Sequence, residues 1–229
     1  MEESIVNLSP SELAKQYAPI LKMDMNEPFL PYAAGITVFE KDAASPSFRR
    51  NIEFSSQTKL VIEYAIFWDY DIQHLYDLEH IWIYVNHEGA VYHCEASFHG
   101  KYFKGLLKDH RNLHGNHVML FCQPGKHAFS PIVEVFDLIP KAELASNETA
   151  GCDGLLVPWL FQDEFATSPE LDEKVETYIK QSFAFTPMGQ YVSYTFSDEQ
   201  LMSWEQLKVV IPERIKEQVR VIEEWSGTE

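Results

Sequence analysis

Two long alternating stretches near the middle of the chain constrain the fold most. Lys59 to Asp71 (KLVIEYAIFWDYD) and Asp77 to Val85 (DLEHIWIYV) are rich in β-branched and aromatic side chains. Alternation with a period of two is typical of β-strands, whose successive side chains point to opposite faces of a sheet. The turn NHEG at Asn86 to Gly89 leads into a third such stretch, Ala90 to Gly100, and this arrangement predicts a hairpin. The chain is therefore expected to be built around a β-sheet.

Shorter elements are expected around these strands. Glu27 to Phe39, with prolines near its start, is expected to form an edge strand, and His117 to Pro131 predicts a strand that ends in a Pro-Gly turn. Helical patterns that begin with capping residues predict helices within 9–19, 168–183 and 197–225, the last broken in two at Pro212. The residues alone predict a β-rich core with peripheral helices.

Charge and cysteine content argue against several classes of partner. The formal net charge of -17 repels nucleic acid and anionic membrane surfaces. The three cysteines, Cys94, Cys122 and Cys152, are odd in number and form no CxxC pair, which suits a reducing compartment. The first residues lack the pattern of a signal peptide, and no stretch approaches the roughly 18 apolar residues of a membrane helix. We expect a cytoplasmic protein with no nucleic-acid partner and no integral membrane contact.

Metal-competent side chains gather between the two long stretches. Asp77 and Glu79 are two residues apart, so on a strand they project from the same face. His74 is expected in the turn that enters this strand, and Asp69 or Asp71 can reach the same point from the end of the preceding strand. Carboxylates this close repel one another, and a divalent cation removes that cost.

The types of donor in this segment indicate which metal would suit it. Carboxylate oxygens with a single imidazole favour Mg, Mn or Ca, whereas further imidazoles would favour Zn, which stays possible. The alternative is a solvated acidic loop with one structural histidine and no metal. All nine histidines lie between His74 and His127, and most of them are expected to be ordinary surface side chains.

Three segments resemble, in order, the motifs of a known family. HLYDLEH (74–80), SFHG (97–100) and PGKHAFSP (124–131) are similar to segments of the necrosis- and ethylene-inducing-like proteins and of a related fungal vacuolar-sorting-type family. Those proteins carry a His-x-x-Asp-Trp-Glu core, then Ser-x-His-Gly, then Gly-Ser-His-Ala. The segment LAKQYAPILKM (13–23) also resembles the opening of the vacuolar-sorting-type members, so the match runs from about Leu13 to Pro131.

The resemblance implies a β-sandwich that binds a divalent cation in a cleft. The implied ligands are an aspartate on the neighbouring strand, with Asp69 as the first choice and Asp71 as the alternative, together with His74, Asp77 and Glu79. The two downstream histidines of the family correspond to His99 and His127, which are the candidate catalytic residues and would line the pocket or act through water.

The chain departs from the family at several places around these residues. Leu78 stands where the family has tryptophan, and Lys126 replaces a serine and could hold an anionic group. The toxins of the family are secreted and usually disulfide-bonded, which does not fit this chain. Membrane damage is therefore not carried over.

The expected fold is mainly β: one domain of residues 1–229, with a β-sandwich core at 13–144 and a helical C-terminal part at 145–229 packed on it. The expected function is divalent-cation-dependent recognition or hydrolysis of a small polar ligand, such as an ester, phosphoester or sugar. The chain lacks GxSxG, HExxH, Walker and GxGxxG motifs, which favours binding over a metal-dependent hydrolase. The third possibility is a structural cation in a protein-interaction module.

Overall fold

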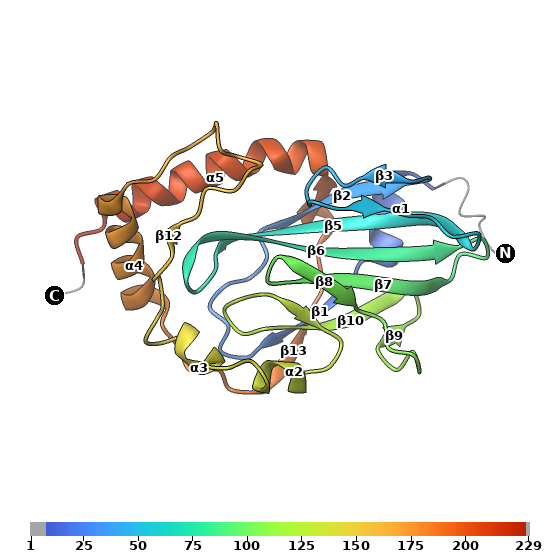
Figure 1. The fold of residues 1–229 in the computed structure, drawn as a ribbon, viewed down its shortest axis with the longest axis horizontal. Coiled ribbons are helices and arrows are strands. Elements are labelled where there is room, and N and C mark those ends of the chain that lie inside the picture. Colours follow the sequence, from blue (N-terminus) through green and yellow to red (C-terminus); the bar gives the residue numbers. More distant parts are fainter. Residues whose placement is uncertain (1–7, 228–229) are drawn as a thin grey trace.

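The computed structural model describes residues 8–227, so residues 1–7 and 228–229 of the expected domain lie outside the described part. The fold is mainly β with two main sheets, as predicted (Figure 1). The larger sheet has the strand order β14 (Leu201–Ser203), β2 (Ala33–Phe39), β5 (Thr58–Tyr70), β6 (His74–Asn86), β7 (Val91–Phe98) and β8 (Lys101–Lys104), with β12 (Gly154–Leu155) paired to β6. The second has the order β11 (Phe129–Ser130), β10 (His117–Cys122), β1 (Ile20–Asp24) and β13 (Tyr191–Tyr194), with β9 (Leu113–His114) paired to β10. A separate ribbon joins β3 (Ala43–Ala44) to β4 (Asn51–Ile52).

The predicted pair of long strands forms the centre of the larger sheet. β5 and β6 pair antiparallel from Thr58 opposite Asn86 to Tyr70 opposite Leu75, and β6 continues into the predicted hairpin with β7. Residues that lie directly opposite each other in such a pair share a face of the sheet. This register therefore decides which acidic side chains can meet at the β5–β6 end.

The core lies between the two sheets. Tyr64 of β5 is fully buried in the same hydrophobic cluster as Leu21 of β1 and Leu120 of β10. Trp68 lies near Phe129 of β11, with 6.3 Å between the ring centroids. Each fully buried large side chain contributes about 1.5–3 kcal/mol relative to exposure, so this face fixes the strand register.

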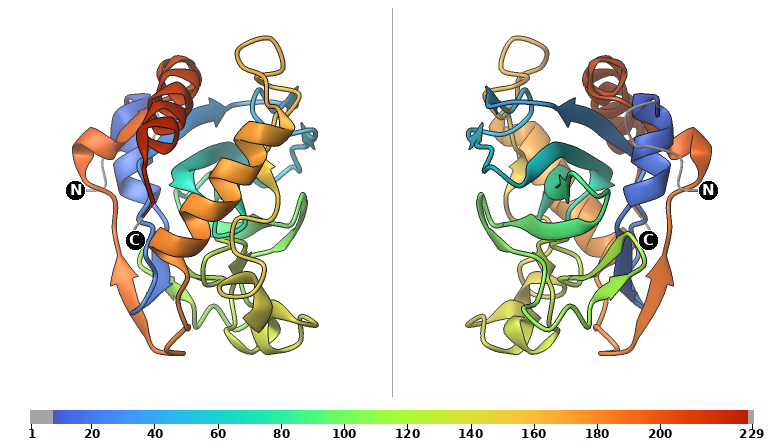
Figure 2. Two further views of the ribbon diagram at one scale, coloured as in Figure 1. Left: turned by 90° about the vertical axis from the view of Figure 1, so that its left-hand side faces the viewer. Right: turned by 90° about the vertical axis from the view of Figure 1, so that its right-hand side faces the viewer.

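Two helices begin where their capping residues predict. α1 (Pro10–Tyr17) starts after Ser9, whose side chain accepts a hydrogen bond from the backbone nitrogen of Glu12. α4 (Pro169–Phe183) starts after Ser168 with proline in its first turn. In Figure 2, α4 crosses the end of the sandwich where the β5–β6 turn lies. The remaining short helical segments are α2 (Glu134–Asp137), α3 (Ala142–Ala145) and the 3-10 helix η2 (Asp198–Gln200).

The prediction of two helical stretches broken at Pro212 is wrong. A single helix, α5 (Trp204–Glu224), runs through Pro212. Leu207, Ile211 and Ile215 are buried along its inner face, and this burial outweighs the lost backbone hydrogen bond of the proline. Gly35 of β2 permits the close approach, because a Cβ atom there would lie 3.0 Å from both Leu207 and Trp204.

The C-terminal part is not purely helical, which corrects the expected boundary of the sheet at residue 144. β12 pairs with β6, β13 with β1, and β14 with β2. These strands have two to four residues each, and only their place beside a longer strand makes them strands. A sequence pattern of that length carries no periodic signal.

Gly151 fixes the segment before β12 against the β5–β6 turn. Its backbone nitrogen donates a hydrogen bond of 2.8 Å to the carbonyl of Ile72. Its φ is +78°, and a Cβ atom would lie 2.5 Å from the backbone of Glu176 in α4. We expect Gly151→Ala to lower the free energy of unfolding by about 2 kcal/mol or more, because steric overlap adds to backbone strain. Urea denaturation measures this.

Gly189→Ala is the matched control for that substitution. Gly189 also has a positive φ of +71°, but no heavy atom lies within 4 Å of its Cβ position. Its replacement should cost only the backbone strain, about 1 kcal/mol. Equal losses in the two variants would show that packing against α4 does not matter.

Candidate functional site

A pocket opens at the edge of β6 close to the β5–β6 turn. The pairing of β6 with β7 ends at Ile81 and Ala96, and β12 pairs only with His74 and Leu75. β5 pairs with one edge of β6 through this stretch, but in the described part of the chain no strand pairs with the other edge of β6 between these two points. The pocket there has a volume of about 520 Å³.

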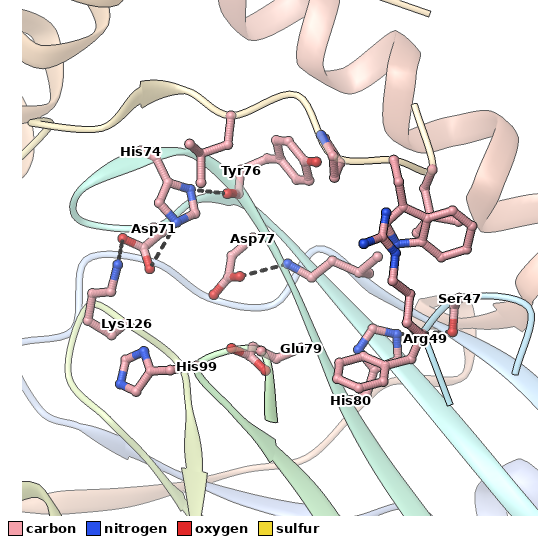
Figure 3. A pocket seen from close by; sticks show the side chains of 17 residues that line it. Ser47, Arg49, Asp71, His74, Tyr76, Asp77, Glu79, His80, His99 and Lys126 are labelled. Atoms are coloured by element: carbon pink, nitrogen blue, oxygen red, sulfur yellow. Dashed lines mark hydrogen bonds and ion pairs between the residues drawn. The ribbon is translucent and has the colours of Figure 1, made fainter. Parts of the chain in front are cut away.

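Asp71, His74, Asp77, Glu79, His99 and Lys126 lie toward one side of the pocket, and Ser47, Arg49 and His80 lie toward the other (Figure 3). The apolar residues that line the pocket are Phe48, Leu78, Leu156, Pro158, Trp159 and Leu160. The structure thus brings together His74, Asp77 and Glu79 with Asp71, which was the alternative to Asp69 in the predicted ligand set.

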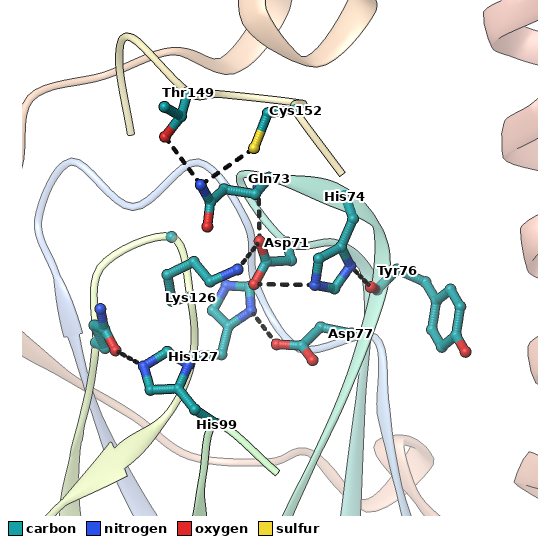
Figure 4. Close-up of polar contacts among 12 residues, drawn as sticks. Asp71, Gln73, His74, Tyr76, Asp77, His99, Lys126, His127, Thr149 and Cys152 are labelled. Atoms are coloured by element: carbon teal, nitrogen blue, oxygen red, sulfur yellow. Dashed lines mark hydrogen bonds and ion pairs between the residues drawn. The ribbon is translucent and has the colours of Figure 1, made fainter. Parts of the chain in front are cut away.

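Asp71 is the most strongly paired of the three acids. Its Oδ1 accepts a hydrogen bond of 2.8 Å from Lys126 Nζ and one of 2.6 Å from the backbone nitrogen of Gln73. His74 Nε2 lies 3.6 Å from Asp71 Oδ2, and His74 Nδ1 is 2.7 Å from the carbonyl oxygen of Tyr76. Figure 4 shows these contacts around the tip of the hairpin. The ammonium group of Lys126 therefore neutralises a buried carboxylate.

Asp77 is paired with a histidine in the interior of the sandwich. Its Oδ2 lies 3.1 Å from Nδ1 of His127, which is fully buried and stacked on Trp68 with 4.4 Å between ring centroids. His127 Nε2 lies 3.6 Å from Glu27. Burial lowers the pKa of His127, but these two carboxylates raise it to about 10. Burial raises the pKa of Asp77, and the contact with His127 reverses this and lowers it.

Glu79 lies two residues further along β6, and its pKa is raised, whereas that of Asp77 is lowered. Burial and the neighbouring charge of Asp77 raise the pKa of Glu79 to about 8. Ser97 of β7 donates a short hydrogen bond to this carboxyl group. At neutral pH Asp77 is therefore ionised, whereas Glu79 holds a proton. Two adjacent carboxyl groups with separated pKa values are a frequent property of functional sites.

His99 and two neighbours of the site have left-handed backbone. Tyr76, His99 and His127 have φ of 55°, 49° and 54°. Residues other than glycine rarely adopt these values, and such conformations are concentrated at ligand sites. His99 is exposed in the pocket wall, and its Nε2 lies 2.8 Å from Oε1 of Gln123.

Asp69, the first choice as metal ligand, lies apart from this group and does not line the pocket. Its two oxygens lie 3.2 and 2.5 Å from the guanidinium nitrogens of Arg214 in α5. The register explains this, because Trp68 lies opposite Asp77 and shares its face, so that Asp69 points to the other face. β5 ends at Tyr70, so Asp71 leaves the strand and turns toward the pocket.

Several apolar residues of the pocket come from the segment after β12. Leu155 and Phe161 of this region are buried. Leu156 and Trp159, however, are each 43% exposed and line the pocket. The guanidinium carbon of Arg49 lies 5.3 Å from the centroid of the Trp159 ring.

Three residues of the site escaped the sequence analysis as candidates. Glu27 approaches His127 from the segment before β2, and no local pattern marks it. Ser97 and Gln123 flank the predicted histidines; the motif SFHG includes Ser97 and gives a weak signal for it. All three act through contacts between segments distant in sequence.

His80 lies on the opposite face of β6 from Glu79. It is buried beside Trp82, its Nε2 lies 3.0 Å from the hydroxyl of Ser47, and its Nδ1 has no hydrogen-bond partner among the described residues. Burial and the charge of Arg50 lower the pKa of His80 to about 3. His80 is therefore a neutral core residue, although its edge reaches the pocket.

Comparisons with family models, with curated proteins and with solved structures found no match to the chain. The resemblance to the necrosis- and ethylene-inducing-like proteins thus rests on the quoted motifs. Within residues 8–227, no three His, Cys, Asp or Glu side chains are arranged to hold a metal ion as they stand. In the same range, no helix has the length and apolar character needed to span a membrane.

Proposed function

We propose that the pocket binds a divalent cation and, through it, a small polar ligand. The observation that carries this proposal is the convergence of Asp71, Asp77 and Glu79 with His74 on one pocket, where the charge of Asp77 contributes to the raised pKa of Glu79. A cation is the ligand that relieves such repulsion. The oxygen-rich donor set favours Mg, Mn or Ca, with Zn as the alternative ion.

The donor atoms of these residues suit a cation, and each carboxylate also has a partner within the chain. Asp71 forms an ion pair with Lys126, Asp77 forms one with His127, and Glu79 accepts a hydrogen bond from Ser97. Glu79 must also lose its proton. Cation binding is thus expected to strengthen as the pH rises toward 8, since proton loss from Glu79 precedes ligation.

Recognition is favoured over hydrolysis by the position of the two candidate catalytic histidines. His127 is fully buried, and its ring nitrogens face Asp77 and Glu27, so no ligand in the pocket reaches them. Of these two histidines, only His99 lines the pocket. We therefore assign His127 to positioning Asp77 and His99 to contact with the ligand.

Hydrolysis is the second candidate, and the separated pKa values of Asp77 and Glu79 favour it. A protonated Glu79 beside an ionised Asp77 has the properties of a general acid and its charged partner. The substrate would be a phosphoester, ester or glycoside that fits the pocket. Turnover of any member of such a panel, lost in Glu79→Gln, would decide for this candidate.

The protein is proposed to act in the cytoplasm. Its three cysteines are all free, and Cys94 and Cys122 are buried with raised pKa values because of burial. Free thiols of this kind are typical of proteins in a reducing compartment.

Asp71→Asn and Asp69→Asn form a matched pair that tests the proposed ligand set. We expect Asp71→Asn to weaken cation binding by about tenfold or more, because it removes one of the charged ligands. Asp69→Asn should leave it unchanged and cost less than about 1 kcal/mol of stability, since its pair with Arg214 is partly exposed. Elemental mass spectrometry after soaking and desalting measures the retained metal. Equal retention in the two variants would contradict the assignment.

A further inference from the structure

A second cavity lies behind the wall that His99 and Lys126 form. Its volume is about 290 Å³, and both residues line it as well as the main pocket. Its other polar walls are Gln73, Gln123 and Thr149, and Lys141 stands at its margin beside the apolar residues of the α3 region. Figure 4 shows Gln73, Thr149, Lys126 and His99 around this space. We call it the side cavity.

The side cavity differs in charge from the rest of the molecule. Two lysines and a histidine line it, and no aspartate or glutamate is among the lining residues that the structure describes. The whole chain carries a net charge of -17. Lys141 makes no ion pair within the described residues, in contrast to Lys126, which holds Asp71. A local positive surface on so acidic a protein attracts small anions.

Gln123 supplies a fixed hydrogen-bond donor to this cavity. The residue is 4% exposed, and its Oε1 is occupied by His99. The amide nitrogen of Gln123 donates no side-chain hydrogen bond to another described residue, and Gln123 lines the cavity. The backbone of Gln123 is held by hydrogen bonds with Lys126, His127 and Ala128, so the side chain starts from a rigid turn. A donor that has no partner within the protein is available to a ligand or to water.

We propose that the side cavity binds a small anionic group, a carboxylate or a phosphate. Lys141 supplies a charge that no described carboxylate pairs with, Lys126 adds N–H donors beside its ion pair with Asp71, and the amide of Gln123 supplies a further hydrogen bond. Because Lys126 and His99 face both cavities, the bound anion lies next to the main pocket. A ligand that fills both would present its acidic group here and its polar remainder to Asp71, Asp77 and Glu79. Anion binding in the side cavity needs no cation. It can therefore be tested separately from the proposed cation binding in the main pocket.

The test is a titration of chelator-treated, isotope-labelled protein with inorganic phosphate, and separately with acetate, followed by amide chemical shifts in NMR. We expect saturable shifts at Gln73, Gln123, Lys126 and Thr149. Lys141→Gln should weaken binding by about threefold to fivefold, as expected for one exposed charge. Gln123→Leu should weaken it by about tenfold through loss of the amide donor.

Lys108→Gln is the matched control, because it removes the same charge from an exposed lysine outside both cavities. The proposal is overturned if neither anion gives saturable shifts, if the shifts map elsewhere, or if Lys141→Gln and Lys108→Gln bind equally. Binding of acetate alone, phosphate alone or both supports it and names the acidic group. If Gln123→Leu does not fold, the comparison of the two lysine variants decides.

Discussion

Replacing His127 with alanine is expected to lower the free energy of unfolding by about 3–5 kcal/mol, the range for breaking a buried ion pair from one side. His127 is fully buried, stacks on Trp68 and faces both Asp77 and Glu27. Its removal leaves two carboxylates without their common partner and opens a cavity beside Trp68. Urea denaturation at pH 7 measures the loss.

Two controls separate the ion pair from the stacking contact. His87→Ala removes an exposed histidine from the β6–β7 turn and should change stability by less than about 0.5 kcal/mol. The double variant Asp77→Asn/His127→Ala should lose less stability than the sum of the two single variants. His127→Ala leaves the charge of Asp77 unpaired, and Asp77→Asn removes that charge. Strict additivity, or a loss below about 1 kcal/mol in His127→Ala, would contradict the described pairing.

Acid is expected to destabilise the wild-type protein more strongly than the variant His80→Gln. The pKa of His80 is about 3 in the folded protein and about 6.5 in the unfolded chain, where the imidazole is solvated. Between these values the unfolded state binds the extra proton, so stability falls as the pH falls. The slope is about 1.4 kcal/mol per pH unit for one group, or roughly 3 kcal/mol between pH 7 and pH 4.

Glu79 changes the pH dependence of stability in the opposite direction to His80. The quantity to measure is therefore the difference in unfolding free energy between wild type and His80→Gln. Its raised pKa means that the folded state binds the proton more tightly, and that contribution is lost as the pH rises toward 8. It is present in both wild type and His80→Gln and cancels in the difference. Thermal or urea denaturation of both proteins from pH 4 to pH 8 provides the curves. A constant difference across this range would show that His80 titrates normally.

The central hairpin and half of the site could be predicted because they depend on local periodicity. Alternation in 59–71 and 77–85 was sufficient for β5 and β6, and the spacing of Asp77 and Glu79 correctly put both on one face. The choice between Asp69 and Asp71 depended instead on where β5 ends and on the pairing of Trp68 with Asp77. That register follows from burial against the second sheet, which the sequence pattern does not reveal.

The rest of the site depends on contacts between distant segments. Glu27 reaches His127 from the region before β2, and Trp159 reaches the pocket from the segment after β12. An apolar run such as 155–161 has the same composition whether it fills a core or lines a pocket. His127 also illustrates the limit, because its motif predicted a pocket residue and the fold buries it under Asp77.

Isothermal titration calorimetry of chelator-treated protein with Mg²⁺, Ca²⁺, Mn²⁺ and Zn²⁺ tests the central claim most directly. Asp109→Asn, which changes an exposed carboxylate, is the control for overall charge. The account predicts that at least one ion binds wild type and Asp109→Asn at one site per chain, more tightly at pH 8 than at pH 6, and does not bind Asp77→Asn. Binding of none of the four ions to wild type, or equal binding to Asp77→Asn, would contradict it.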